Sequence, residues 1–192
     1  MAVVKYSNDV QELYVAYFGR PADAAGLEFW TNHMANSSTG YQDISAAFSS
    51  SLEYQGRYEG MDNRAIVSEV YENLFGRVAE GEGVDFWAAA LDTNTISIDN
   101  VVTQIADGAQ GSDSLAYYGK IAVAMRFTDR LDTTVEQAAY SGEAANRIAM
   151  EYLGGVRDLA STNEHLDADQ IDATIAQIVG TPIGAEIAPL VV

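Results

Sequence analysis

Apolar residues recur along most of the chain at the spacing of three and four that is typical of amphipathic helices. In residues 10–18 this spacing predicts a helix that ends at Gly19, because glycine adopts positive φ without steric cost. Asp23 is a good N-cap for a second helix, and a third helix is predicted over residues 41–54. The residues expected to face the core are Val10, Leu13, Tyr14, Tyr17 and Phe18, then Leu27, Trp30 and Met34, then Ile44, Phe48 and Leu52.

The pattern of residues 13–30 returns in residues 70–87. Beyond this stretch, equivalent positions of the two units remain apolar at the same offset, as Ile44 and Val101 do. A matching core with a diverging surface is typical of a duplicated fold, so further helices are predicted over residues 67–75, 82–91 and 98–106. The identical pairs are Tyr14/Tyr71, Phe18/Phe75, Gly19/Gly76, Arg20/Arg77, Ala22/Ala79, Gly26/Gly83, Phe29/Phe86 and Trp30/Trp87.

After residue 126 the repeat fades while helical spacing continues. One long helix is predicted from a cap at Ser112 or Asp113, and another contains a break at Gly154 and Gly155. A capping-box-like start at Asp167 predicts a last helix that Gly180 ends. Strand-like alternation is scarce, so the sequence predicts an all-α protein with no sheet. Its expected parts are a repeat unit at 8–66, a repeat unit at 67–126 and a C-terminal helical region with an apolar tail at 127–192.

Within the repeated segment, the glycines are expected to end helices and the aromatic residues to fill the core. Trp30 and Trp87 occupy equivalent positions at core spacing, which favours packing over binding. Arg20 and Arg77 each follow a helix end, where a guanidinium binds the last carbonyls or a nearby carboxylate. The candidate partners are Asp23 and Glu28 for Arg20, and Glu80 and Asp85 for Arg77; the alternative for both arginines is ligand recognition.

The text "LYVAYFGRPADAAGLEFW", followed by an apolar helix and "SSSLEYQGRY", resembles a bacterial domain-of-unknown-function repeat family, number 4214. That family is common in large secreted RTX-type and S-layer-like surface proteins. The resemblance covers residues 10–58 well, and residues 67–109 with a changed tail. It implies export by a type I route, a place at the cell surface and a part in assembly or attachment.

The composition of the chain restricts the classes of partner and ligand that it is expected to bind. The chain has 28 acidic and 10 basic residues, a net charge of -18, and no cysteine. Such a field repels phosphate backbones, so no nucleic-acid partner is expected, and disulfides and thiolate metal sites are excluded. The start of the sequence has no apolar run after a basic segment, so no Sec-type signal is expected. No stretch approaches the length of a membrane helix, so no transmembrane segment is expected.

Catalytic motifs are absent from the sequence: it contains no HExxH, nucleophile elbow or phosphate loop. His33 is expected to be a structural histidine beside an apolar face, and His165 to be exposed. Paired carboxylates hydrolyse glycosides, but a chain this acidic brings carboxylates together by chance. The sequence therefore predicts no enzyme, with a carboxylate-dependent hydrolase as the least favoured alternative.

Two short acidic segments offer the oxygen ligands that calcium prefers, and calcium is the only cofactor that the sequence suggests. They contain Glu80, Glu82 and Asp85, and Asp167 and Asp169. Helix capping by Asp167 and weak surface binding of cations are the alternatives. A set of aromatic and basic side chains is predicted to make intermolecular contacts: Tyr54, Tyr58, Tyr117, Tyr118, Arg20 and Arg77.

These observations lead to one functional hypothesis and one main alternative. The hypothesis is a secreted or cell-surface structural protein, without catalysis, that assembles with copies of itself or attaches to surface polysaccharide through divalent cations. The alternative is a glycan- or lipopolysaccharide-binding adhesin module with its site between the two units.

Overall fold

The computed structural model describes the fold of residues 2–181 and the side chains of residues 6–98 and 100–181. The apolar tail predicted at the C-terminus lies outside the described residues. Within them the protein is all-α, as predicted, and contains no strand. The helices are α1 (Ala2–Phe18), α2 (Ala24–Asn36), α3 (Gly40–Ser49), α4 (Leu52–Tyr58), α5 (Asn63–Phe75), α6 (Gly81–Asp92), α7 (Ile98–Asp107), α8 (Ser112–Asp129), α9 (Thr134–Ala139), α10 (Gly142–Gly154), α11 (Leu159–His165) and α12 (Ala168–Gly180).

The first helix of each unit follows the predicted pattern but begins earlier in the chain. All five residues expected on the inner side of α1 are buried. Gly19 and Gly76 follow α1 and α5 with φ of 63° and 65°, the left-handed conformation that favours glycine after a helix. This confirms their predicted role.

The N-caps of the second helices differ as the side chains predict. Asp23 accepts a hydrogen bond from the Gly26 backbone N–H at 2.7 Å and caps α2. Glu80, at the equivalent place before α6, makes no side-chain cap. The longer glutamate fits the cap geometry less well than aspartate does.

The predicted third helix over 41–54 is wrong in its C-terminal part. The chain breaks between α3 and α4, and the Ser51 side chain caps α4 by accepting from the Tyr54 backbone N–H. The break rotates the helical face, so Leu52, expected in the core, is 88% exposed. Ile44 and Phe48 lie before the break and are buried as expected.

The C-terminal region is helical, with more interruptions than its pattern predicts. The break at Gly154 and Gly155 is present, and Asp167 caps α12 by accepting backbone hydrogen bonds from Asp169 and Gln170. The short helices α9 and α11 were not predicted. Both begin with capping boxes, from Thr133 and Asp158, and both are too short to carry a clear apolar period.

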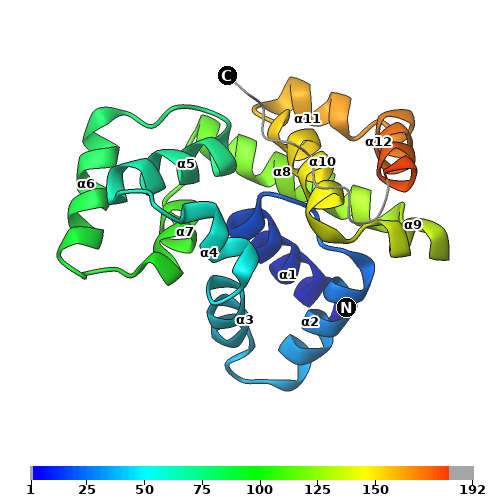
Figure 1. Ribbon diagram of the computed structural model, residues 1–192, viewed down its shortest axis with the longest axis horizontal. Coiled ribbons are helices and arrows are strands. Elements are labelled where there is room, and N and C mark those ends of the chain that lie inside the picture. Colours follow the sequence, from blue (N-terminus) through cyan, green and yellow to red (C-terminus); the bar gives the residue numbers. More distant parts are fainter. Residues whose placement is uncertain (1, 182–192) are drawn as a thin grey trace.

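Figure 1 shows the helices gathered around α1 and the long α8, with α2–α4, α5–α7 and α9–α12 forming three groups. One hydrophobic core joins α1–α7 to the first part of α8, and a second joins the end of α8 to α9, α10 and α12. Phe127 in α8 belongs to the second core, whereas Val123 and Ala124 belong to the first. The boundaries predicted at 66/67 and 126/127 both fall inside helices, α5 and α8.

Candidate functional surfaces

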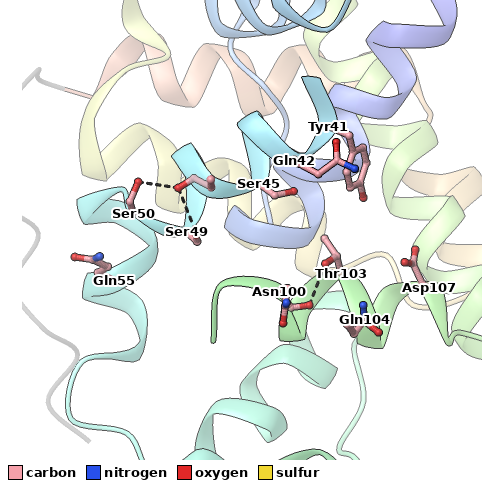
Figure 2. Close-up of a pocket in the computed structure, with 11 residues that line it drawn as sticks. Tyr41, Gln42, Ser45, Ser49, Ser50, Gln55, Asn100, Thr103, Gln104 and Asp107 are labelled. Carbon is pink, nitrogen blue, oxygen red and sulfur yellow. Dashed lines mark hydrogen bonds between the residues drawn. The ribbon is translucent and has the colours of Figure 1, made fainter. Parts of the chain in front are cut away.

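A polar pocket of about 460 Å³ lies between α3 and α7, the equivalent helices of the two repeats. Most of its described lining residues are polar but uncharged. Figure 2 shows that Gln55 of α4 lies at the end opposite Tyr41 and Asp107. The α3 wall contains Tyr41, Gln42 and Ser45, and the α7 wall contains Thr103, Gln104 and Asp107. We refer to it as the α3–α7 pocket.

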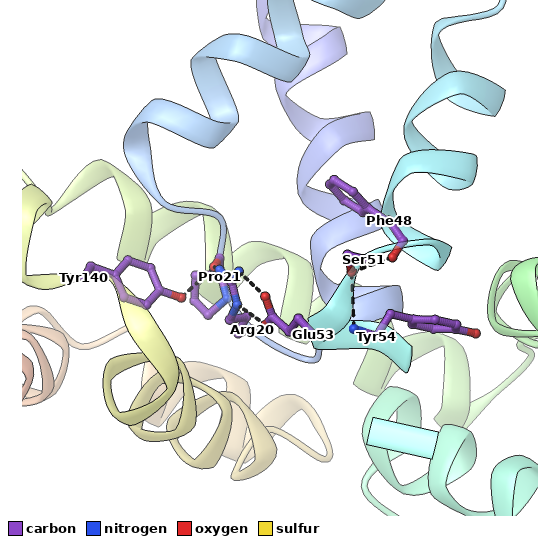
Figure 3. A network of polar contacts seen from close by, with 7 residues as sticks. All are labelled: Arg20, Pro21, Phe48, Ser51, Glu53, Tyr54 and Tyr140. Atoms are coloured by element: carbon purple, nitrogen blue, oxygen red, sulfur yellow. Dashed lines mark hydrogen bonds and ion pairs between the residues drawn. The ribbon is translucent and has the colours of Figure 1, made fainter. Parts of the chain in front are cut away.

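Arg20 forms a buried clamp (Figure 3). Its Nε and Nη2 donate to the two carboxylate oxygens of Glu53 at 2.7 and 2.9 Å, and its Nη1 donates to the carbonyl of Pro21 at 3.2 Å. Tyr140 donates to the same carbonyl at 2.6 Å. Burial opposes the charged form, but the hydrogen bond and charge of Glu53 outweigh it and raise the pKa of Arg20. The clamp joins α1, α4 and the C-terminal region, so Arg20 has the structural role predicted for it.

The partner of Arg20 differs from the predicted ones, which were Asp23 and Glu28. Arg77 repeats the arrangement with Asp113, to which its Nε and Nη2 both donate at 2.7 Å. Glu80, one of its two predicted partners, also pairs with Arg77, at 3.0 Å. These hydrogen bonds raise the pKa of Arg77, with that of Asp113 contributing most.

A second local similarity in the sequence would have pointed to Glu53 and Asp113. Residues 51–56 and 114–119 share the pattern Ser-Leu-x-Tyr-x-Gly, at a longer offset than the main repeat. Glu53 aligns there with Ala116, and Asp113 lies one helical turn before Ala116. The acidic partner has therefore moved by one turn along the same helix face.

The Phe-Trp pair that occurs in both repeats is only partly buried. Trp30 and Trp87 are half-buried and pack against the core, and the Trp30 ring lies edge-on to Phe48 with centroids 5.6 Å apart. The preceding residues are not core, in contrast to the prediction: Phe29 is 62% and Phe86 66% exposed. Adjacent residues of a helix point in different directions, and on α2 and α6 the tryptophan takes the inner side and the phenylalanine the outer side.

Three of the tyrosines predicted to make intermolecular contacts are buried. Tyr54, Tyr58 and Tyr117 lie in the core and offer no contact surface, whereas Tyr118 is 60% exposed. The hydroxyl of Tyr54 donates to the Ile98 carbonyl, and burial raises the pKa of Tyr58 to about 12. The polar neighbours that suggested exposure occupy the outer faces of the same helices.

The carboxylates predicted to bind calcium do not converge. Glu80 pairs with Arg77, Asp85 pairs with Arg64, and Asp167 caps α12. Glu82 and Asp169 lie exposed in the first turns of α6 and α12. Among the described residues, no three His, Asp or Glu side chains are placed to hold a metal ion. Binding of calcium elsewhere, for example between copies, stays a prediction.

The histidines have local partners. His33 Nε2 lies 3.0 Å from Asp43 Oδ2, and this hydrogen bond is the main cause that lowers the pKa of Asp43. His165 is partly buried rather than exposed as predicted. Its Nδ1 lies 2.8 Å from the Ser161 carbonyl, and a Cβ at Gly155 would lie 2.4 Å from its Nε2.

A second pocket of about 460 Å³ gathers four of the ten basic residues: Arg57, Lys120, Arg147 and Arg157. The ends of α1, α5 and α10 meet there, at Gly19, Asn73 and Gly154. Lys120 is buried and donates to the Asn73 carbonyl at 2.7 Å, and burial lowers its pKa to about 8. Helix C-termini carry negative partial charge, which gives this cluster a structural role.

Comparison with known proteins places the repeat in a family. The sequence model described as "Domain of unknown function (DUF4214)" matches residues 4–58 and again residues 46–110. No curated protein and no solved structure matches the chain. In residues 2–181, no helix combines the length and the hydropathy that crossing a bilayer requires. Because the two matches together span more than half of the sequence, the chain belongs to the DUF4214 family.

Proposed function

We propose that this chain is a non-catalytic structural domain of a secreted or cell-surface protein, and that it self-associates through the exposed phenylalanines of its two repeats. Type I export, an S-layer-like setting and a role for calcium between copies are parts of the same proposal. The family match supports the repeat but assigns no activity.

The observation that carries the proposal is the equivalence of Phe29 and Phe86. They are the same residue at the same place in α2 and α6, and both are largely exposed. Each ring is held edge-on by the following tryptophan, with centroids 4.8 and 5.0 Å apart. A chain with the same fixed apolar contact at two places is suited to bind two neighbours, as an assembling subunit must.

The gain from burying the phenylalanines and the repulsion between acidic copies together predict a weak self-association that depends on salt. Burying a phenylalanine side chain contributes about 1.5–3 kcal/mol. A net charge of -18 opposes the approach of a second copy, and salt or a divalent cation reduces that repulsion. Association is therefore expected to rise with ionic strength and with calcium.

The absence of catalysis in the proposal is supported by how the conspicuous polar groups are used. Arg20 and Arg77 hold carboxylates, Asp167 caps a helix, and both histidines have intramolecular partners. A hydrolase would instead be supported by a pair of carboxylates left facing a cleft.

Sedimentation velocity across protein concentration, with and without NaCl and CaCl2, tests the proposal. The wild type is expected to form larger species in salt or calcium, and the Phe29→Gln/Phe86→Gln variant to remain monomeric. Val135→Gln is the matched control, since Val135 is 62% exposed but lies outside the repeats. A wild type that stays monomeric in every condition overturns the proposal, as does equal assembly of the double variant.

A further inference from the structure

The α3–α7 pocket presents exposed polar groups that no other described part of the protein binds. The side-chain amides of Gln42, Gln55 and Gln104, together with the Tyr41 hydroxyl, make no hydrogen bond within the described residues, although all four groups line the pocket. Ser45 Oγ lies beside them, is shielded from solvent and also lacks a described partner. Tyr41, Gln42, Gln55 and Gln104 are exposed, so it is their polar groups, rather than the shielded Ser45 hydroxyl, that a ligand in the pocket is able to reach.

The charges of the residues that line the pocket favour a neutral ligand over an anionic one. Among the described residues of its lining, Asp107 is the one that carries a charge, and none is basic. Burial and the nearby Asp107 and Glu12 carboxylates raise the pKa of Tyr41, so its hydroxyl stays protonated and remains a donor. An anionic ligand would meet no counter-charge among the described lining residues and would be repelled by a chain of net charge -18.

Uncharged amides and hydroxyls each both donate and accept hydrogen bonds. Sugar hydroxyls have the same double capacity, and an aromatic ring such as that of Tyr41 offers a flat apolar face for the C–H side of a sugar ring. Figure 2 shows Gln42 and Ser45 on the α3 side and Gln104 on the α7 side of the opening. A pocket of about 460 Å³ is within the range of small-ligand sites.

We propose that the α3–α7 pocket binds a neutral saccharide, with Gln42 and Gln104 as hydrogen-bonding residues and Tyr41 as the stacking residue. The site goes beyond self-assembly and does not depend on it. A single open polar pocket is expected to bind with a Kd of about 1 mM. In an assembly, many weak sites acting together would give a much higher apparent affinity.

The test is titration of the Phe29→Gln/Phe86→Gln variant with neutral disaccharides built from glucose, galactose, mannose and N-acetylglucosamine. This background separates sugar binding from self-association, so each proposal is able to fail alone. The readout is the shift of the glutamine side-chain amide signals in nitrogen–proton NMR spectra. At least one disaccharide is expected to shift the Gln42 and Gln104 signals, and glucuronic acid to bind more weakly than glucose.

Single variants then assign the residues. Gln104→Ala and Tyr41→Ala are each expected to weaken binding about fivefold, the effect of losing one hydrogen bond or a comparable contact. Gln177→Ala is the control, because Gln177 is an exposed glutamine on α12. No shift with any disaccharide overturns the proposal. Tighter binding of glucuronic acid, or unchanged binding in both pocket variants, also overturns it.

Discussion

The Tyr14 hydroxyl occupies the space that a side chain at Gly26 would need: a Cβ at Gly26 would lie 2.2 Å from the Tyr14 oxygen. The second repeat has the same relationship in looser form, because a Cβ at Gly83 would lie 3.2 Å from the Tyr71 oxygen. The tyrosine of each repeat therefore favours a glycine at the position it contacts, which explains why Tyr14/Tyr71 and Gly26/Gly83 are both among the identical pairs.

This difference predicts unequal effects of the same substitution. Gly26→Ala must displace the tyrosine or the helix and is expected to destabilise by about 1–3 kcal/mol. Gly83→Ala needs a movement of only a few tenths of an ångström, and the gain of about 0.5–1 kcal/mol from replacing a helical glycine offsets it. Urea unfolding of the two variants measures the difference; equal loss in both would contradict this account of the glycines.

The two arginine clamps differ in burial and should differ in their contribution to stability. The Arg20 side chain is 8% exposed and that of Arg77 32%. Arg20→Met removes a nearly buried guanidinium and its hydrogen bonds to Glu53 and is expected to cost about 1.5–3 kcal/mol. Arg77→Met is expected to cost less, about 1 kcal/mol, since solvent screens the more exposed guanidinium of that pair.

Thermal unfolding in a double-mutant cycle with Glu53→Gln separates the pair from the packing of the arginine stem. Arg20→Lys is the informative control, because lysine keeps the charge but lacks the planar fork that binds both oxygens. Full stability in Arg20→Lys would show that charge alone suffices at this position.

Lys120 predicts a pH dependence of stability. Its pKa is about 8 in the folded protein against the usual 10.5, so between these values the unfolded chain binds more protons and the free energy of unfolding rises with pH. The rise from pH 8 to pH 10 is expected to be about 2 kcal/mol. Above pH 10 the buried tyrosines, whose folded pKa values are raised, act in the opposite direction.

Lys120→Met removes the titrating group while keeping the length of the side chain. Its stability is expected to change less between pH 8 and pH 10 than that of the wild type, whatever its stability at pH 7. Parallel pH profiles for the two proteins would mean that Lys120 titrates normally.

The break before α4 predicts a contrast between two residues that sequence spacing places on one inner face. Leu52→Ala is expected to change the free energy of unfolding by less than about 0.5 kcal/mol, because the side chain is exposed. Ile44→Ala is expected to cost about 2–5 kcal/mol through a core cavity. Chemical denaturation of both variants checks this, and a large loss in Leu52→Ala would indicate an unbroken helix.

The fold was predictable where spacing and helix ends agree. The face of α1, the left-handed Gly19 and the Asp23 cap all follow from local chemistry that one segment contains. Leu52 was misplaced because Ser51 reads equally well as a helix residue and as a cap. Tyr54 and Tyr117 were misplaced because their burial depends on which helices pack against them, and local sequence does not carry that information.

Candidate surfaces were harder to predict than elements. The arginines were predicted to bind carboxylates, but Glu53 and Asp113 are 33 and 36 residues away from them, beyond any helical spacing. The residues of the α3–α7 pocket were not predicted, although the alternative hypothesis placed a glycan site between the two units. The pocket forms from glutamines and serines on two separate helices, and neither segment has a recognisable motif.

Because α8 passes without interruption from one core into the other, residues 2–181 have no place where they divide into independent pieces. A fragment ending at residue 126 would lose Leu153 and Val156, which are buried in the first core. The duplicated segments are therefore expected to melt together with the C-terminal helices in one cooperative transition. Tandem origin, in this molecule, does not confer modular stability.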